Sequence, residues 1–231
     1  MDEPVNRIRR YDASRRQEQA RENRARVLSA ARRLFLDRGY VDTSVPEVAR
    51  AAGVSVQTVY KVFSNKAALL KAVFDVSVAG DDDDTPMAQR EVIHRIQAEP
   101  DAAQKITMYL RHLAEGAPRY VPLQLLARDA ARADPAAADV WARMRQETLT
   151  AMTYFARDLF ATGQLRDTLT EDDVRDVLWT YHSPELYELL VLERGWPADR
   201  YADFLADALI NALGARALGD SAGTGLENPL G

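Results

Sequence analysis

Apolar residues recur at helical spacing along most of the chain. The clearest stripe repeats at i, i+3, i+4, i+7 and i+8, as one buried helix face does: Val27, Ala30, Ala31, Leu34 and Phe35. Gly39 follows this stripe at a position where glycine commonly ends a helix. No segment shows the period-two alternation of a half-buried strand. The pattern therefore predicts an all-α fold.

Three shorter helices follow, and each has a capping residue at its start. Ser44 and Glu47 have the spacing of a capping box, and Ser55 and Asn65 are N-cap residue types. Gly53 supplies the permissive backbone of a tight turn. The predicted helices run from Ser44 to Ala52, from Val56 to Val62 and from Asn65 to Gly80.

Longer helices are predicted beyond the acidic run at residues 81–84, with boundaries at glycine and proline. The breakers are Pro100, Gly116 with Pro118, Pro135, Gly163, Ser183 with Pro184, and Gly195 with Pro197. The predicted helices are Pro86 to Ala98, Asp101 to Glu115, Arg119 to Ala131, Ala136 to Ala161, Glu171 to Tyr181, Pro184 to Glu193 and Ala198 to Leu213.

Composition limits the kind of protein. The 231 residues are 47% hydrophobic and 28% charged, which is typical of a globular protein. No apolar stretch approaches the roughly 18 residues of a spanning helix, and no secretory signal is present, so we expect a cytoplasmic protein. Without cysteine there is no disulfide, thiolate nucleophile or zinc-cysteine cluster.

Charge divides the chain into two parts. Residues 1–71 hold 15 Lys and Arg against 8 Asp and Glu, a formal charge of +7, while the remainder carries −12. A basic segment joined to an acidic body is typical of a nucleic-acid-binding module on a body that does not contact phosphate. Within the basic segment, residues 43–66 have helix-turn-helix spacing, with small Ala49 and Gly53 where two short helices approach. The alternative is an ordinary helical hairpin beneath a solvated face.

The run from Ala30 to Leu70 resembles the N-terminal domain of the TetR family of bacterial transcriptional regulators. The segments AARRLFLDRGY and TSVPEVARAAGVSVQTVYKVFSNKAALL carry the likeness, together with Tyr60, Phe63 and Lys66. The resemblance implies a three-helix helix-turn-helix domain on a larger C-terminal helical domain that binds a ligand and dimerises. The expected divisions are a basic arm (1–22), a DNA-binding domain (23–71), a regulatory and dimerisation domain (72–217) and a disordered tail (218–231).

The resemblance also implies a DNA-binding surface. We expect Thr43 and Ser44 to offer hydroxyl and amide to a phosphate, and Gln57 and Thr58 to face base edges. Tyr60, Lys61 and Lys66 are expected to contact the DNA backbone. Ser55 and Val56 complete the predicted surface. Two alternatives remain for the arginine-rich arm: a disordered, solvated extension, or an arm that follows phosphates or enters the minor groove.

A pocket for a small, mainly apolar effector is predicted inside the body by analogy with the family, although such residues are core by default. Its predicted lining is Phe74, Tyr109, His112, Leu126, Met144 and Trp179. A homodimer is predicted from two seams, one along residues 141–159 and one along 201–213.

Other motifs favour neither an enzyme nor a metal site. Residues 219–223 match G-x-S-x-G, but a nucleophile elbow needs a preceding strand and a later histidine. The run Asp81–Asp84 lacks the spacing of a calcium loop, and Ser183-Pro184 interrupts the helix that would align His182 with Glu185 and Glu188. No cofactor or metal is expected.

The sequence thus predicts a ligand-responsive regulator, most simply a repressor, that binds a pseudo-palindromic operator as a dimer and is released by an effector. The alternative is an effector-independent helix-turn-helix protein that binds DNA or recruits a partner.

Overall fold

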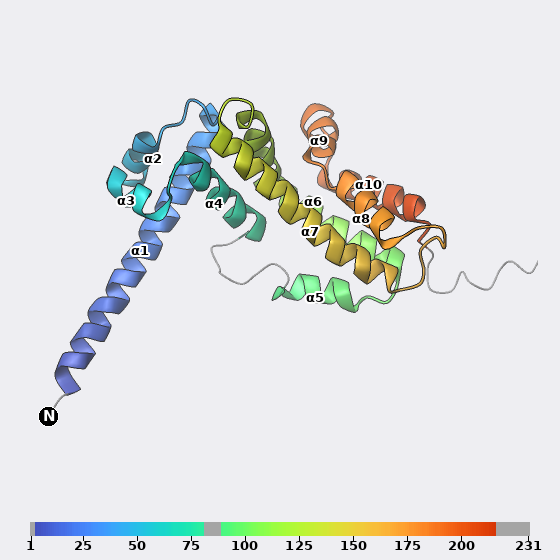
Figure 1. Ribbon diagram of the computed structural model, residues 1–231, viewed down its shortest axis with the longest axis horizontal. Coiled ribbons are helices and arrows are strands. Elements are labelled where there is room, and N and C mark those ends of the chain that lie inside the picture. Colours follow the sequence, from blue (N-terminus) through green and yellow to red (C-terminus); the bar gives the residue numbers. More distant parts are fainter. Residues whose placement is uncertain (1–2, 81–88, 216–231) are drawn as a thin grey trace, which may run out of the picture. The chain divides into compact units, whose positions relative to one another are not determined.

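The computed structural model describes residues 3–80 and 89–215, with side chains from Arg15 onward except that of Arg16, and within these ranges it contains no strand. The predicted all-α fold is therefore confirmed, with a helix-turn-helix N-terminal part and a larger helical C-terminal part (Figure 1). The elements are α1 (Glu3–Arg38), α2 (Val45–Ala52), α3 (Val56–Val62), α4 (Lys66–Ala79), α5 (Glu91–Ala98), α6 (Ala102–Ala130), α7 (Pro135–Phe160), α8 (Glu171–Tyr181), α9 (Pro184–Tyr187), the π-helix η2 (Glu188–Glu193) and α10 (Ala198–Leu213).

The chain forms two compact units. The first contains the described residues of 1–82 together with 122–141, which are the end of α6, the α6–α7 turn and the start of α7. The second contains the described residues of 83–121 and 142–231. The boundary expected after residue 71 falls inside α4, whose residues all belong to the first unit.

The first unit is built around the apolar stripe of α1. Val27, Ala31 and Phe35 are each at most 2% exposed, and α1 packs against α2 and α4. The predicted caps are present: the side chains of Ser44, Ser55 and Asn65 accept backbone N–H groups at the starts of α2, α3 and α4. Gly53 ends α2 with a φ of +66°, where a side chain would be strained. The short helices therefore begin and end where local chemistry places them.

The first helix is longer than its buried stripe. It begins at Glu3, so the segment expected as an arm continues α1 as helical backbone rather than as a disordered extension. Figure 1 shows this N-terminal half running on beyond α2, α3 and α4.

One predicted break is wrong: α6 continues through Gly116 and Pro118. Proline lacks the N–H that would bond the carbonyl of residue i−4, and this loss alone disfavours a continuous helix. Burial of the same turn opposes that cost, because Ala114 is 3% exposed and Ala117 is fully buried. Burial in the body has overridden the local preference.

The helix predicted at residues 184–193 changes type within that range. The α-helical turn Pro184–Tyr187 is followed by six residues of π-helix, Glu188–Glu193. Apolar spacing does not distinguish these forms over so few residues.

The predicted dimer seams are also wrong in detail, because their residues are largely the core of a single chain. Met144 and Met152 of α7 are at most 2% exposed, as are Leu205 and Leu209 of α10. An apolar helix stripe buries against whichever surface is available, and here α10 packs on α8 and η2 of its own chain.

Some predicted features lie outside the described residues: the acidic run at 81–84, the start of the helix expected at Pro86, the tail from 218 and the G-x-S-x-G motif. Among the residues that are described, no helix is long and apolar enough to cross a membrane.

Candidate nucleic-acid interface

The second helix of the motif, α3, turns a polar face outward. Gln57, Tyr60 and Lys61 are exposed, with Tyr60 at 50%, whereas Val59 is 1% exposed and packs inward. A seven-residue helix that is buried on one side only presents its other side to a partner. The outward groups are an amide, a phenol and an ammonium, which suit base edges and phosphates.

The start of α3 is held by its own residues. The Ser55 hydroxyl accepts the backbone N–H of Thr58 at 3.0 Å, and the two hydroxyl oxygens lie 2.7 Å apart. Val56 and Thr58 are half-buried. Ser55 and Thr58 therefore fix the backbone that presents Gln57, and each already has a hydrogen-bond partner.

The groups predicted to open α2 toward a phosphate are already bonded. Both the amide and the hydroxyl of Ser44 donate to the Glu47 carboxylate, at 3.0 and 2.7 Å. Thr43 is 1% exposed, and its hydroxyl bonds the carbonyl oxygens of Leu34 and Gly39 at 3.1 and 2.8 Å. The Thr43 hydroxyl thus holds the turn between α1 and α2, and its predicted contact with phosphate is corrected.

Glu47 carries charge at the open end of α2. Hydrogen bonds from Ser44, and to a smaller extent the nearby Arg38 guanidinium, hold the pKa of this carboxyl below its ordinary value. An ion pair of 3.1 Å joins Glu47 to Arg38 of α1. A carboxylate in the first turn also complements the helix dipole. This end of α2 is therefore acidic at its capping box, and α3 provides the basic part of the surface.

Lys66 has an additional role that the sequence did not indicate. Its ammonium donates to the Tyr40 carbonyl at 2.8 Å and lies 4.2 Å from the centre of the Tyr40 ring. A cation over an aromatic face is attracted by the ring quadrupole. Lys66 is half-buried and links the start of α4 to the turn after α1.

Tyr40 in turn reaches the α6–α7 turn. Its hydroxyl donates to the Asp134 carboxylate at 2.6 Å, and the other oxygen of Asp134 accepts the N–H of Ala136 at 2.9 Å. Burial raises the pKa of Tyr40, and the Tyr40 bond lowers that of Asp134. The phenol therefore stays a donor and the carboxyl an acceptor at neutral pH. Asp134 thus links Tyr40, in the turn after α1, to the start of α7. All of these residues belong to the first unit.

The six residues predicted to line an effector pocket belong to both units. Phe74 and Leu126 lie in the first unit, and the other four lie in the second. Phe74 and Met144 are buried, at 7% and 1% exposure, whereas the remaining four are half-buried. Trp179 lies beneath the guanidinium of Arg145, 5.0 Å from the ring centre. The pocket itself stays a prediction.

Tyr109 lies in an aromatic cluster that the prediction only partly included. Its ring centre is 4.5 Å from that of Phe155 and 6.3 Å from that of His182, and its hydroxyl approaches the Met152 sulfur at 3.9 Å. The buried Nδ1 of His182 has no hydrogen-bond partner among the described residues. Burial lowers the pKa of His182, so the ring is neutral at pH 7. The three-residue spacing of Trp179 and His182 is the sequence signal that could have added His182 to the predicted set.

Two hollows flank α1 in the first unit. One, of about 220 Å³, lies against α4 and is lined mainly by apolar groups that include Leu28 and Val73. The other, of about 360 Å³, lies against α2 and includes Arg26 and Arg33. Neither contains a residue of the predicted effector pocket.

A short capped helix, a glycine turn and a second helix with a polar outer face together define a helix-turn-helix protein. Residues 27–73 match the family described as bacterial regulatory proteins, tetR family. This match supports the resemblance of residues 30–70 to the TetR family that the sequence predicted.

Curated relatives match the same region. The chain is 41% identical over 61 residues to the HTH-type transcriptional regulator TtgR of Pseudomonas putida, which covers 26% of this chain and 29% of that protein. It is 35% identical over 65 residues to the regulator AcrR of Shigella flexneri, covering 28% and 30%. The matches thus span about three tenths of the length of these relatives.

Solved structures extend the likeness in fold to the body. The repressor NalD of Pseudomonas aeruginosa aligns with 87% of this chain and all of its own, with a TM-score of 0.66 and 20% identity. The regulator FadR of Bacillus subtilis, solved with stearoyl-CoA, aligns with 81% of this chain and 98% of its own, with a TM-score of 0.65 and 16% identity. The whole helical architecture is therefore shared with such regulators.

Proposed function

We propose that this chain is a dimeric transcriptional repressor that reads a pseudo-palindromic DNA operator through α3 and leaves it when a small, mainly apolar effector binds the body. One observation carries the DNA-binding part of the proposal: the outward face of α3 is polar and basic, and it is mounted on capped helices in a segment of charge +7. The match of residues 27–73 to the TetR family supports it.

Gln57 and Tyr60 have different roles in this proposal. Gln57 reads a base edge, since its amide can both donate to and accept from adenine. Tyr60 and Lys61 contact phosphates and position the helix without selecting a sequence. Lys66 offers charge beside Tyr40, whereas the Ser44 amide and hydroxyl must leave the Glu47 carboxylate before they can meet a phosphate.

Selection of duplexes from a random library tests the DNA-binding proposal. We expect a palindrome whose half-sites lie about one DNA turn, roughly 34 Å, apart. Gln57→Ala should lower affinity by about 1 to 3 kcal/mol and relax preference at one base pair of each half-site. Tyr60→Ala should weaken all sequences alike. Gln146→Ala, at an exposed glutamine of α7, is the matched control. Failure to enrich any sequence would overturn the proposal.

The proposed dimer uses apolar residues that the folded chain leaves at its surface. Leu189 and Leu192 of η2 are 50% and 52% exposed, and Phe204 of α10 is 43% exposed. Since η2 and α10 contact each other, these side chains belong to neighbouring elements of one unit. Exposed apolar groups of this size on adjacent helices favour contact with a second copy. Sedimentation of Phe204→Asp should give a folded monomer.

The proposed effector is mainly apolar because half-buried aromatic residues of the body, including Tyr109 and Trp179, offer apolar area with few polar tips. The stearoyl-CoA in the Bacillus subtilis FadR structure is a ligand with a long apolar chain in a protein of similar fold. A panel of lipophilic and aromatic molecules is titrated against the protein–operator complex while the melting temperature of free protein is followed. A ligand that raises the melting temperature and releases DNA supports the effector, and Trp179→Ala, within the second unit, should weaken both effects. A panel without any such ligand favours the effector-independent alternative.

A further inference from the structure

The N-terminal half of α1 buries none of the side chains that the structure describes there. The helix starts at Glu3, but its first buried residue among those with described side chains is Val27, and residues 17–22 are all exposed. At 1.5 Å per residue, the segment before Val27 is about 36 Å long. From residue 12 to residue 22 the helix is polar apart from Ala13 and Ala20. Such a helix is usually held by side-chain pairs or by a partner. Gln19 pairs with Glu22 and with Asn23, each at 3.3 Å.

One face of α1 changes its chemistry along its length. Steps of alternately four and three residues stay on one side of a helix, drifting around it by only about 20° per seven residues. From the C-terminal end this face carries the buried residues Phe35, Ala31 and Leu28. The same steps lead next to four arginines, with only Gln17 and Ser14 between them, and we call these four the arginine stripe: Arg24, Arg21, Arg10 and Arg7.

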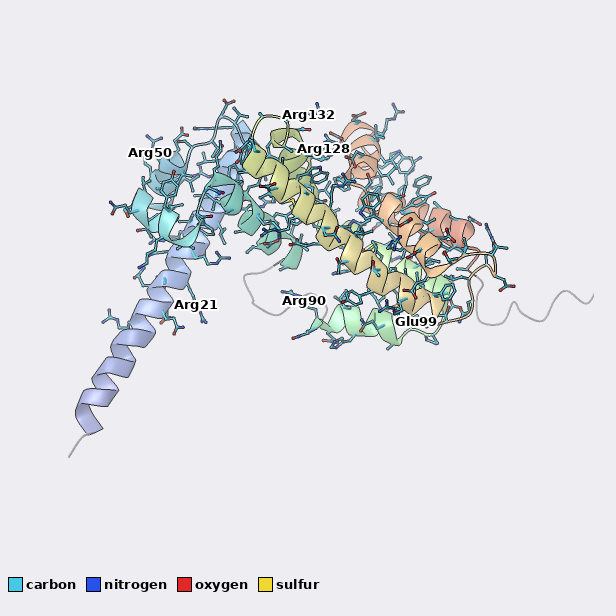
Figure 2. All side chains as sticks on the ribbon, in the orientation of Figure 1. Arg21, Arg50, Arg90, Glu99, Arg128 and Arg132 are labelled. Carbon is cyan, nitrogen blue, oxygen red and sulfur yellow. The ribbon has the colours of Figure 1, made fainter. Side chains whose placement is uncertain are left out.

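A contact fixes where the arginine stripe begins. The Arg24 guanidinium lies 5.3 Å from the centre of the Phe63 ring, and Phe63 is the residue that ends α3. The stripe therefore leaves the domain beside the end of the reading helix. Arg21 marks the part of α1 that emerges below α2–α4 in Figure 2. From Arg24 to Arg7 the stripe extends about 26 Å, roughly three quarters of a turn of B-DNA.

The geometry restricts how such a helix meets DNA. An α-helix with its side chains is about 10 to 12 Å wide, whereas the minor groove is about 6 Å wide, so the helix cannot enter it. The major groove of the half-site is taken by α3 in the proposed function. The sugar-phosphate backbone remains, and guanidinium groups bind phosphate oxygens in pairs of hydrogen bonds.

We propose that the N-terminal half of α1 is a second DNA contact, in which the arginine stripe binds phosphates of the duplex that flanks the operator half-site. This inference rests on the proposed function, because α3 must first place α1 beside the DNA. The contact adds affinity and salt dependence and carries no sequence information.

The test compares two faces of the same helix in the full-length protein. The stripe variant carries Arg7→Gln, Arg10→Gln and Arg21→Gln. The control variant carries Arg9→Gln, Arg15→Gln and Arg16→Gln, which removes the same charge from other faces of the same segment. Arg24 is left in place because it packs on Phe63. The probes are the library-selected duplex trimmed to its site and the same duplex extended by about 12 base pairs at each end, one DNA turn or slightly more.

On the extended duplex we expect the stripe variant to lose about tenfold or more in affinity, and the slope of log K against log salt to fall by about 2 to 3, since each phosphate contact contributes about 0.9. On the trimmed duplex it should bind like the wild type. The control variant should show smaller changes in affinity and salt slope than the stripe variant shows on the extended duplex, whichever duplex is used. Replacing the same three stripe arginines with lysine should restore most of the slope, and circular dichroism should show the same helix content throughout.

Equal losses for the stripe and control variants would overturn the inference, as would equal effects on trimmed and extended duplexes. The proposed function fails differently: Gln57→Ala would then leave sequence preference unchanged whatever the arginine variants do. The two failures are therefore distinguishable in one set of titrations.

Discussion

The two units differ in what determines where their helices end. In the first unit, α2, α3 and α4 start at side-chain caps, and α2 and α4 end at glycines with positive φ, Gly53 and Gly80. In the second unit, α6 runs through Gly116 and Pro118 without ending. A helix of seven or eight residues has few internal hydrogen bonds, so its ends dominate its stability. A helix of 29 residues is held by the surface that it buries.

The difference suggests what each unit requires. In the proposed function α3 must present its backbone at a fixed position, and the local cap at Ser55 fixes that position within a few residues. The body needs a packed interior more than fixed helix ends, so local signals there are weaker guides. The comparison is not absolute, since α8 also starts at a capping box, formed by Thr170 and Asp173.

The largest effect is expected from charging the core of the second unit. Leu209 is 1% exposed, so Leu209→Asp buries a carboxylate without a partner and should cost at least about 4 kcal/mol of unfolding free energy. Asp207→Ala, on the exposed face of the same helix, should change that free energy by less than about 1 kcal/mol. Denaturant unfolding measures both. A folded, stable Leu209→Asp protein would contradict the burial of this seam.

Next in size is the buried ion pair of the second unit. The Lys105 ammonium, 2% exposed as a residue, donates to Asp158 at 2.7 Å and to the Gln97 carbonyl at 3.0 Å. Asp158→Ala leaves the ammonium without its counter-charge and should cost about 3 kcal/mol. Combining it with Lys105→Met should recover much of that loss in denaturant unfolding. If the double variant is no more stable than Asp158→Ala, the stability lost in Asp158→Ala does not come from leaving the Lys105 ammonium unpaired.

Removing the capping boxes tests whether local signals have equal weight in both units. Ser44→Ala and Thr170→Ala should each cost about 1 kcal/mol. Hydrogen bonding lowers the pKa of Glu47 and of Asp173, so their stabilisation is complete above the ordinary carboxyl values of 4.5 and 3.8 and is lost as the pH falls through the lowered values. Glu47→Gln should remove this acid sensitivity from α2. An unchanged pH profile of stability would show that the carboxylate is dispensable.

The smallest effects come from two glycines. Gly53→Ala places a side chain at φ +66° and should cost about 1 kcal/mol. Gly116 is helical, and a methyl there lies 3.1 Å from a ring carbon of Tyr120. Alanine has a higher helix propensity than glycine by up to about 1 kcal/mol, and this gain offsets the close contact. The unfolding free energy of Gly116→Ala should therefore stay within about 0.5 kcal/mol of the wild-type value. Melting curves of the two variants measure the difference in stability. Equal losses for Gly53→Ala and Gly116→Ala would contradict the view that helix ends matter more in the first unit.

The same distinction explains how much of the fold could be predicted. The bounds of α8 and α10 match the prediction because a cap or proline marks the start and Ser183-Pro184 or Gly214 follows the end. The bounds of α3 match too, although only its start is marked, by Ser55, and Phe63 follows its end. The continuity of α6 could not be predicted, since burial of Ala117 depends on distant parts of the chain. The π-helical turn of η2 has no signal in apolar spacing.

The outward side chains of the candidate site could be predicted from the sequence. The contacts that hold its helices in place could not. Spacing and family likeness placed Gln57, Tyr60 and Lys61 outward on α3. The links of Tyr40 to Asp134 and to Lys66 join residues 94 and 26 positions apart. No local pattern reports such pairs. The Thr43 hydroxyl was assigned to phosphate for a different reason: its carbonyl partners, Leu34 and Gly39, are close in sequence, but backbone groups leave no mark in the residue pattern.

The bond between Tyr40 and Asp134 bears on how this regulator can be recombined with others. A chimera that joins residues 1–80 to a foreign helical body leaves the Tyr40 hydroxyl without its carboxylate, and a buried donor without a partner destabilises a fold by about 1 to 3 kcal/mol. The exchangeable module is therefore discontinuous: it consists of the N-terminal helices and the hairpin tip at 122–141. If the proposed function holds, transplanting both segments together should keep the operator specificity of one parent, while the foreign body supplies the effector response.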